Sequence, residues 1–165
     1  MRDWSSDVCS SDLYRRARQL HLAAKTIMAN HGGCFPTTFP EVLALPGIGR
    51  YTAGAILSIS LGLRHPIVEA NTIRLFARLL HVSTEVTATR TQKQFWEFAN
   101  WILPHKHLSD FNQALMEVGS LICTPKSPAC DECPLRTLCP TFVSQAFDKI
   151  PKPKQKTKSK QVQEV

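Results

Sequence analysis

Four cysteines near the C-terminal end, Cys123, Cys130, Cys133 and Cys139, constrain the fold of this chain more than any other feature. They follow the pattern C-x6-C-x2-C-x5-C, which places four thiols within one short segment. Thiolates bind soft and borderline metals, so a zinc ion and an iron–sulfur cluster both satisfy this spacing. Two disulfides are the alternative, but nothing else in the sequence indicates secretion. The pattern therefore predicts a metal cage.

The rest of the chain shows helical periodicity and no convincing alternation of the kind that strands require. Apolar residues recur at intervals of three and four, and glycine or proline interrupts the pattern between segments. The sequence predicts an all-α domain with short linkers. The predicted helices cover residues 15–30, 41–45, 50–61, 70–80, 91–102 and 109–122.

The charge of the chain points toward an anionic partner. Its 165 residues carry a formal net charge of +7, with a pI near 9.3. Nucleic acid is the first candidate and an acidic membrane surface the second. No apolar run approaches the roughly 18 residues that span a bilayer.

The first thirteen residues need separate treatment, because "RDWSSDVCSSDL" matches the in-frame translation of a sequencing adapter. It has no apolar stretch of the kind that signal peptides carry. Removing Arg2 and the three aspartates of this segment takes away a charge of −2 and leaves +9. We expect an artefact at 1–13, a natural chain that begins upstream, a partial helical domain at 14–64, a second helical domain at 65–140 and a lysine-rich tail at 141–165.

The segment "LPGIGRYTAGAI" predicts a hairpin between two helices. Gly47 and Gly49 allow a positive φ and a close approach of backbone N–H groups to a ligand. Together with the start of the next helix, these groups suit a DNA phosphate. Ile48 is expected to anchor the hairpin in the core. The alternative is a plain corner between helices that binds nothing.

The hairpin, an acid some twenty residues later and the cysteine pattern together resemble the helix–hairpin–helix DNA glycosylases related to endonuclease III. The blocks "YRRARQLH", "LPGIGRYTAGAI", "PIVEANTIRLFARLL" and "FNQALMEVGSLIC" carry the resemblance over residues 14 to about 153. Within that superfamily the chain is most similar to the adenine-removing branch. The resemblance implies a [4Fe–4S] cluster on the four cysteines, mainly structural and DNA-positioning. It also implies DNA contacts by Pro46, Gly47, Ile48, Gly49, Arg50, Tyr51 and Asn71.

The same resemblance implies base excision repair by hydrolysis of the N-glycosidic bond of adenine paired with 8-oxoguanine or guanine. Bifunctional relatives carry a lysine where this chain has Tyr51, so the Schiff-base route is absent there and a monofunctional enzyme is implied. The partner would be double-stranded DNA with a mismatched or damaged pair. A monomer in the bacterial cytoplasm, at the nucleoid and away from membranes, is expected.

The resemblance also implies that Glu69 corresponds to the family's catalytic aspartate beneath the sugar, and that Asn71 supports it. The alternative interpretations are a helix-start acid favoured by the helix dipole and, for Asn71, a plain N-cap. The base-protonating glutamate and the 8-oxoguanine-recognising domain of the family are not found, so an inactive fragment is expected. Two other functions stay open, a glycosylase for another base and a non-catalytic DNA-binding iron–sulfur protein.

Overall fold

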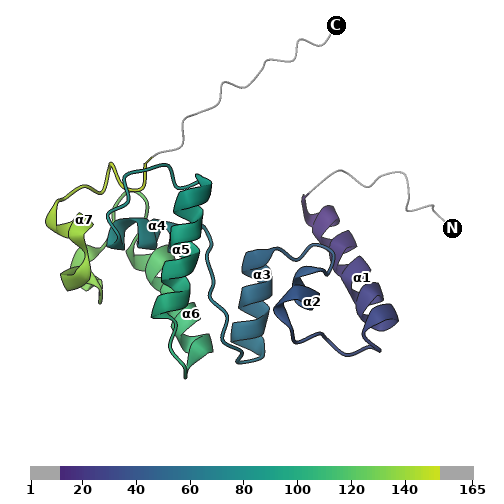
Figure 1. Cartoon of the computed structure of the whole chain (residues 1–165). Helices are drawn as coiled ribbons and strands as arrows, with labels where there is room; N and C mark the ends of the chain where they lie inside the picture. Colours follow the sequence, from purple (N-terminus) through teal and green to yellow (C-terminus); the bar gives the residue numbers. More distant parts are fainter. Residues whose placement is uncertain (1–11, 153–165) are drawn as a thin grey trace, which may run out of the picture. The chain divides into compact units, whose positions relative to one another are not determined.

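The computed structural model of the protein describes residues 12–152, with side chains from Tyr14 onward. The segment 1–11, expected to be an artefact, and residues 153–165 of the expected tail lie outside the described residues. Residues 12–152 form helices and loops and contain no strand, so the all-α prediction is confirmed (Figure 1). None of the helices in this part of the chain is long and apolar enough to cross a bilayer.

The described residues divide into two compact units. The first contains the residues up to Ile67 together with Leu103–Asn112. Its helices are α1 (Asp12–Asn30), α2 (Phe39–Leu43), α3 (Arg50–Ala55) and the π-helical turn η1 (Ile56–Ser60). The second unit contains Val68–Ile102 and the residues from Gln113 onward.

A small apolar core holds the two helices of the predicted hairpin together. Val42 of α2 and Ala53 and Leu57 of α3 and η1 are fully buried against one another. Phe39 and Ile48 pack against this cluster from its edge. The predicted anchoring role of Ile48 therefore agrees with the structure, and the hairpin is fixed from beneath by burial of apolar surface.

Backbone contacts complete the first unit where the chain leaves η1. Gly54 lies so close to the loop that a Cβ there would come within 2.5 Å of the Pro66 carbonyl oxygen. The side-chain amide of Asn112 donates to Ser58 Oγ at 2.8 Å and to the His65 carbonyl at 3.1 Å. The side chains of Asn112 and Ser58 are buried. These bonds satisfy polar groups that burial would otherwise leave without partners.

Helix α4 (Ala70–Leu79) is the central element of the second unit. It contacts α5 (Thr89–Ile102), the π-helical turn η2 (Val118–Ile122) and α7 (Pro140–Val143). Phe76 is fully buried and meets Phe98 edge to face, with ring centroids 5.2 Å apart, a favourable aromatic geometry. The remaining elements are α6 (Leu108–Glu117) and the 3₁₀ turns η3 (Cys130–Glu132) and η4 (Arg136–Leu138).

Two of the predicted helices end in a π-helical turn, which their α-helical periodicity does not indicate. The segments 50–61 and 109–122 begin as α3 and α6 and finish as η1 and η2. Bonds from Leu61 N to the Ile56 carbonyl at 3.3 Å and from Cys123 N to the Val118 carbonyl at 2.7 Å close these turns. Such π turns add one residue per turn and often lie next to functional sites. The second of them delivers the chain directly to Cys123.

The packed chain continues past Cys139, where the composition predicts a change toward a solvated tail. Helix α7 follows at once, and Ile150 is only 2% exposed. The guanidinium of Arg78 donates to the Ile150 carbonyl at 3.0 Å. The buried Ile150 side chain and this side chain–backbone hydrogen bond help to hold the segment, and composition averaged over a lysine-rich window does not reveal them.

Candidate functional site

Glu69 is the N-cap of α4. Its backbone is extended (φ −141°, ψ −178°), and its carboxylate Oε1 accepts hydrogen bonds from the N–H groups of Asn71 and Thr72, both at 2.9 Å. The hydroxyl of Thr72 in turn accepts from the Glu69 N–H at 2.8 Å, which completes a capping box. Glu69 therefore stands at the position of the helix-start acid in the alternative interpretation, although it is half-buried, and its catalytic role stays a prediction. Asn71 is not the N-cap, so the alternative for that residue is wrong.

The capping box fixes the direction of the Glu69 carboxylate. Oε1 is held by two backbone donors, while Oε2 takes part in neither bond. The side chain is half-buried, so the carboxylate is partly screened from water. The carboxylate can therefore cap the helix through Oε1 and still stabilise a nearby positive charge through Oε2.

Asn71 is held by a side chain of the same helix, one turn further on. Arg74 Nη2 donates to Asn71 Oδ1 at 2.9 Å and also to the Gly119 carbonyl, and Arg74 Nε donates to the Cys123 carbonyl at 2.7 Å. Burial lowers the pKa of Arg74, and the charges of Cys123 and Glu69 act against that shift. A single guanidinium thus connects the start of α4 to the first cysteine of the pattern.

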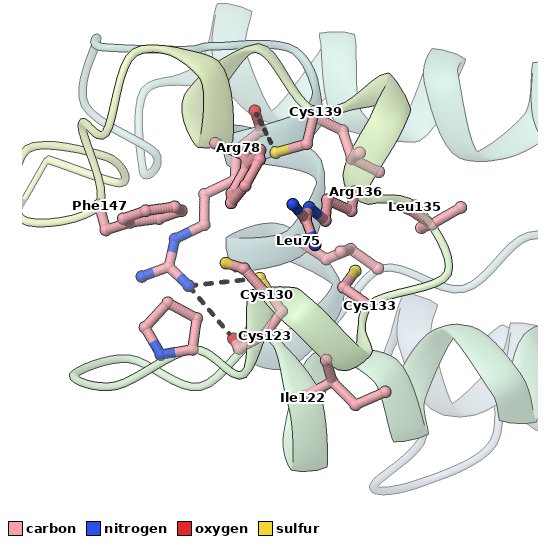
Figure 2. Close-up of a pocket in the computed structure, with 13 residues that line it drawn as sticks. Leu75, Arg78, Ile122, Cys123, Cys130, Cys133, Leu135, Arg136, Cys139 and Phe147 are labelled. Atoms are coloured by element: carbon pink, nitrogen blue, oxygen red, sulfur yellow. Dashed lines mark hydrogen bonds between the residues drawn. The ribbon is translucent and has the colours of Figure 1, made fainter.

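The four predicted ligand cysteines line one pocket in the second unit (Figure 2). All four are free thiols, so the disulfide alternative is wrong for this segment. Cys123 is buried and the other three are half-buried. Among the described residues, no three His, Cys, Asp or Glu side chains are grouped as the ligands of a single metal ion would be.

The chemistry of this pocket fits a cationic iron–sulfur core. The pKa of Cys130 is raised, first by burial and then by the charges of Cys123, Cys133 and Cys139, while Arg78 acts in the opposite direction. The charges of the neighbouring cysteines oppose ionisation of Cys130, so a positive centre among the sulfurs would favour the ionised ligand. Binding to iron supplies that centre in place of the thiol protons.

The predicted DNA-binding hairpin belongs to the first unit, whereas Glu69, Asn71 and the cysteines belong to the second. Gly47 has φ +77°, as expected, but Gly49 does not have a positive φ; it is the N-cap of α3, with φ −92°. A Cβ on Gly49 would meet nothing within 4 Å, so the space above it is open. Arg50 and Tyr51 are exposed beside it, and Pro46 is half-buried.

Three residues that matter for the site, Thr72, Arg74 and Arg78, are absent from the sequence prediction. Thr72 follows Glu69 at the spacing of a capping box and could have been found by that rule. The arginines stand four residues apart inside an apolar helix, which is a signal that at least one of them is buried. Nothing in the sequence reveals what they contact.

Two family models match the chain at the features just described. A helix-hairpin-helix motif matches residues 30–59, and the iron-sulfur binding domain of endonuclease III matches residues 123–139. The fold and the site thus define an all-helical protein with a helix–hairpin–helix and an endonuclease III-type iron–sulfur domain. Its cofactor is a [4Fe–4S] cluster.

The chain is similar in sequence and in fold to DNA glycosylases. An adenine DNA glycosylase of Buchnera aphidicola is 39% identical over 87% of this chain and 41% of its own length. The Homo sapiens adenine DNA glycosylase is 38% identical over 76% of the chain and 23% of its own. A thermostable thymine-DNA glycosylase superposes with a TM-score of 0.71 and 32% identity, over 78% of this chain and 59% of that one. The chain spans less than half the length of the curated relatives it matches.

Proposed function

We propose that this chain is part of a DNA glycosylase that hydrolyses the N-glycosidic bond of adenine paired with 8-oxoguanine or guanine. The observation that carries the proposal is a fixed carboxylate, Glu69, in a chain that is 39% identical to an adenine DNA glycosylase over 143 residues. The proposed setting is base excision repair in a bacterial cytoplasm, by a monomer acting at the nucleoid.

The chemistry requires a negative charge beside the sugar. Cleavage of the glycosidic bond develops positive charge on the sugar ring, as in glycoside hydrolysis. The base is first flipped out of the duplex stack. In the proposed mechanism, the Glu69 carboxylate stabilises the cationic sugar through Oε2 while Oε1 stays bound to the helix start. Asn71, held by Arg74, supports this carboxylate from the same turn.

A glutamate in place of the family's aspartate moves the carboxylate by one methylene, and errors of about 1 Å are costly in catalysis. The capping box offsets the added freedom, because two backbone N–H groups hold Oε1. The Thr72 hydroxyl accepts from the Glu69 backbone N–H and so fixes the backbone that carries the side chain. Glu69 is therefore proposed as a working replacement for the aspartate.

The hairpin is proposed to hold the DNA backbone. The space above Gly49 is open, and Arg50 and Tyr51 are exposed beside it. The N–H groups at the start of α3 and the positive charge of Arg50 suit a phosphate. Tyr51 supplies no amine, so the proposed enzyme releases the base without cutting the strand. Double-stranded DNA with a mismatched or damaged pair is the proposed partner.

Cys123, Cys130, Cys133 and Cys139 are proposed as the ligands of the [4Fe–4S] cluster. They line one pocket, and their segment coincides with the matched iron–sulfur domain. When bound, the cluster supplies a rigid, charged centre that organises a loop with little regular structure of its own. The purified protein is expected to be brown and to contain iron and sulfide.

The Glu69→Gln variant tests the catalytic assignment, within the longest natural reading frame that contains these residues. Excision of adenine from an A·8-oxoguanine duplex should fall by about 10²- to 10³-fold while duplex binding persists. Glu97→Gln, an exposed acid paired with Lys93 on α5, is the matched control and should excise normally. Unchanged excision by Glu69→Gln removes this residue from the mechanism. Binding without excision by the unaltered protein instead favours a non-catalytic DNA-binding iron–sulfur protein.

A glycosylase for another base is the second candidate, because the thymine-DNA glycosylase structure is 32% identical to this chain. Parallel assays on A·8-oxoguanine, G·T and thymine-glycol duplexes distinguish the candidates. Excision confined to the pyrimidine substrates contradicts the adenine proposal and supports the second candidate.

A further inference from the structure

Arg78, in the third turn of α4, is the largest fully buried side chain of the described part of the protein, at 1% exposure. Its guanidinium lies beside the cysteine pocket (Figure 2). Nη1 lies 3.3 Å from Cys123 Sγ and donates to the Thr124 carbonyl at 2.8 Å, and Nη2 donates to the Pro125 carbonyl at 3.2 Å. Nε donates to the Ile150 carbonyl at 3.0 Å.

The partners of Arg78 satisfy its hydrogen bonds but not its charge. They are backbone carbonyls, a thiol and the Phe147 ring, whose centroid lies 5.6 Å from the guanidinium carbon. Among the described residues, no carboxylate forms an ion pair with it. A buried cation without a counter-charge is strongly unfavourable, so this position requires a nearby negative group.

The cysteine pocket supplies that group. An iron–sulfur cluster held by four thiolates carries net negative charge, and hydrogen bonds to its sulfurs and nearby charges set its reduction potential. Arg78 touches the first thiol directly, and its backbone carbonyl faces the last, with Cys139 Sγ 3.8 Å away. We propose that Arg78 is the buried counter-charge of the [4Fe–4S] cluster and a clamp on its entry loop, joining Cys123–Pro125 to the segment at Ile150.

The two roles rest on different properties of the same guanidinium, its charge and its planar set of donors. The charge favours the more reduced, more negative cluster, so it raises the reduction potential. The planar fork holds four carbonyls, those of Cys123, Thr124, Pro125 and Ile150, so it keeps the first cysteine in place. Arg78 acts through the cluster and its ligands, and is a positioning residue rather than a catalytic one.

Arg78→Gln in the cluster-loaded chain tests the charge, with Arg136→Gln as the matched control. Arg136 lines the same pocket, but its side chain is 46% exposed and pairs with Asp131 at 2.9 Å. In a redox titration followed by the cluster's spectrum, Arg78→Gln should lower the equilibrium constant for reduction about tenfold. This corresponds to a reduction potential lower by ~59 mV for a one-electron couple. Arg136→Gln should shift far less. Equal shifts in the two variants, or none in Arg78→Gln, overturn the proposal.

Arg78→Lys separates charge from clamp and covers the case in which the glutamine variant does not fold. Lysine keeps the positive charge but cannot reach four carbonyls with one planar fork. The reduction potential should stay near that of the unaltered protein, whereas iron loss to a chelator should be faster than in Arg136→Gln. A potential displaced further than that of Arg136→Gln contradicts the counter-charge, and iron loss at the unaltered rate contradicts the clamp.

Discussion

At the scale of single residues, Glu69 shows how one carboxylate can cap a helix and also serve in the proposed catalysis. Aspartate, asparagine, serine and threonine are the usual N-caps, and the longer glutamate is not among them. Here the extended backbone of Glu69 lets Oε1 reach the N–H groups of both Asn71 and Thr72. The extra methylene is absorbed by a bonding arrangement that fixes its end point. The proposed catalytic carboxylate is therefore positioned by helix formation itself.

The capping box gives a stability prediction at Thr72, which is fully buried. Thr72→Val keeps the shape of the side chain but removes the hydroxyl that accepts from Glu69 N–H, leaving that donor without a partner. The free energy of unfolding should fall by about 1–2 kcal/mol, measured by urea denaturation. Thr72→Ser retains the hydroxyl and should lose clearly less. Equal losses in the two variants mean that the hydroxyl contributes nothing.

Residue identity also limits what the sequence alone can reveal. The cysteines and Glu69 were found because their chemistry and spacing are informative in themselves. Arg74 and Arg78 were missed because they bind backbone carbonyls 45 to 72 residues away. Every residue carries a carbonyl, so such a contact leaves no trace in the sequence of its acceptor. Only the folded chain shows which carbonyls come together.

At the scale of elements, the helix positions were predicted well, since apolar periodicity reports directly on the buried face of a helix. The ends of α3 and α6 were not, because a π turn at Ile56–Ser60 or Val118–Ile122 preserves the apolar pattern while changing the bonding. The close approach of Gly119 to Asn71 is equally hidden. A Cβ there would come within 2.9 Å of Asn71 backbone atoms, so η2 and α4 meet only because this residue is glycine.

The two glycines of the hairpin allow its structural role and its proposed DNA contact to be tested separately. Gly47→Ala forces a side chain into φ +77° and brings a Cβ within 2.6 Å of Gln19 Cβ on α1. Thermal or urea unfolding should show a loss of about 1–3 kcal/mol. Gly49→Ala meets open space at a negative φ and should cost less than about 1 kcal/mol.

The second half of this prediction concerns DNA. A methyl group at Gly49 fills the space proposed for a phosphate, so duplex affinity should fall several-fold at low salt even though the protein stays folded. Fluorescence anisotropy at several salt concentrations measures this, because phosphate contacts make affinity fall as salt rises. Unchanged affinity for Gly49→Ala would leave the hairpin as an architectural corner only.

At the scale of the whole molecule, one segment of the second unit depends on a source of stability that the first unit does not use. The first is built on an apolar core at Val42, Ala53 and Leu57. The second contains a cysteine segment whose regular structure amounts to the short 3₁₀ turns η3 and η4. Such a loop buries little apolar surface of its own, so the cluster supplies much of the free energy that orders it.

Removing the cluster should therefore affect the two units unequally. Treatment with an oxidant and a chelator should sharply raise amide hydrogen exchange in residues 123–150, because the thiolates lose their positive centre and Arg78 loses its counter-charge. Helices α2 and α3 should keep their protection, since their core contains no cysteine ligand. Hydrogen exchange measured by mass spectrometry before and after iron removal resolves the two regions. A uniform rise along the chain would mean that the units unfold as one, and unchanged exchange at 123–150 would mean that the cluster does not order the loop.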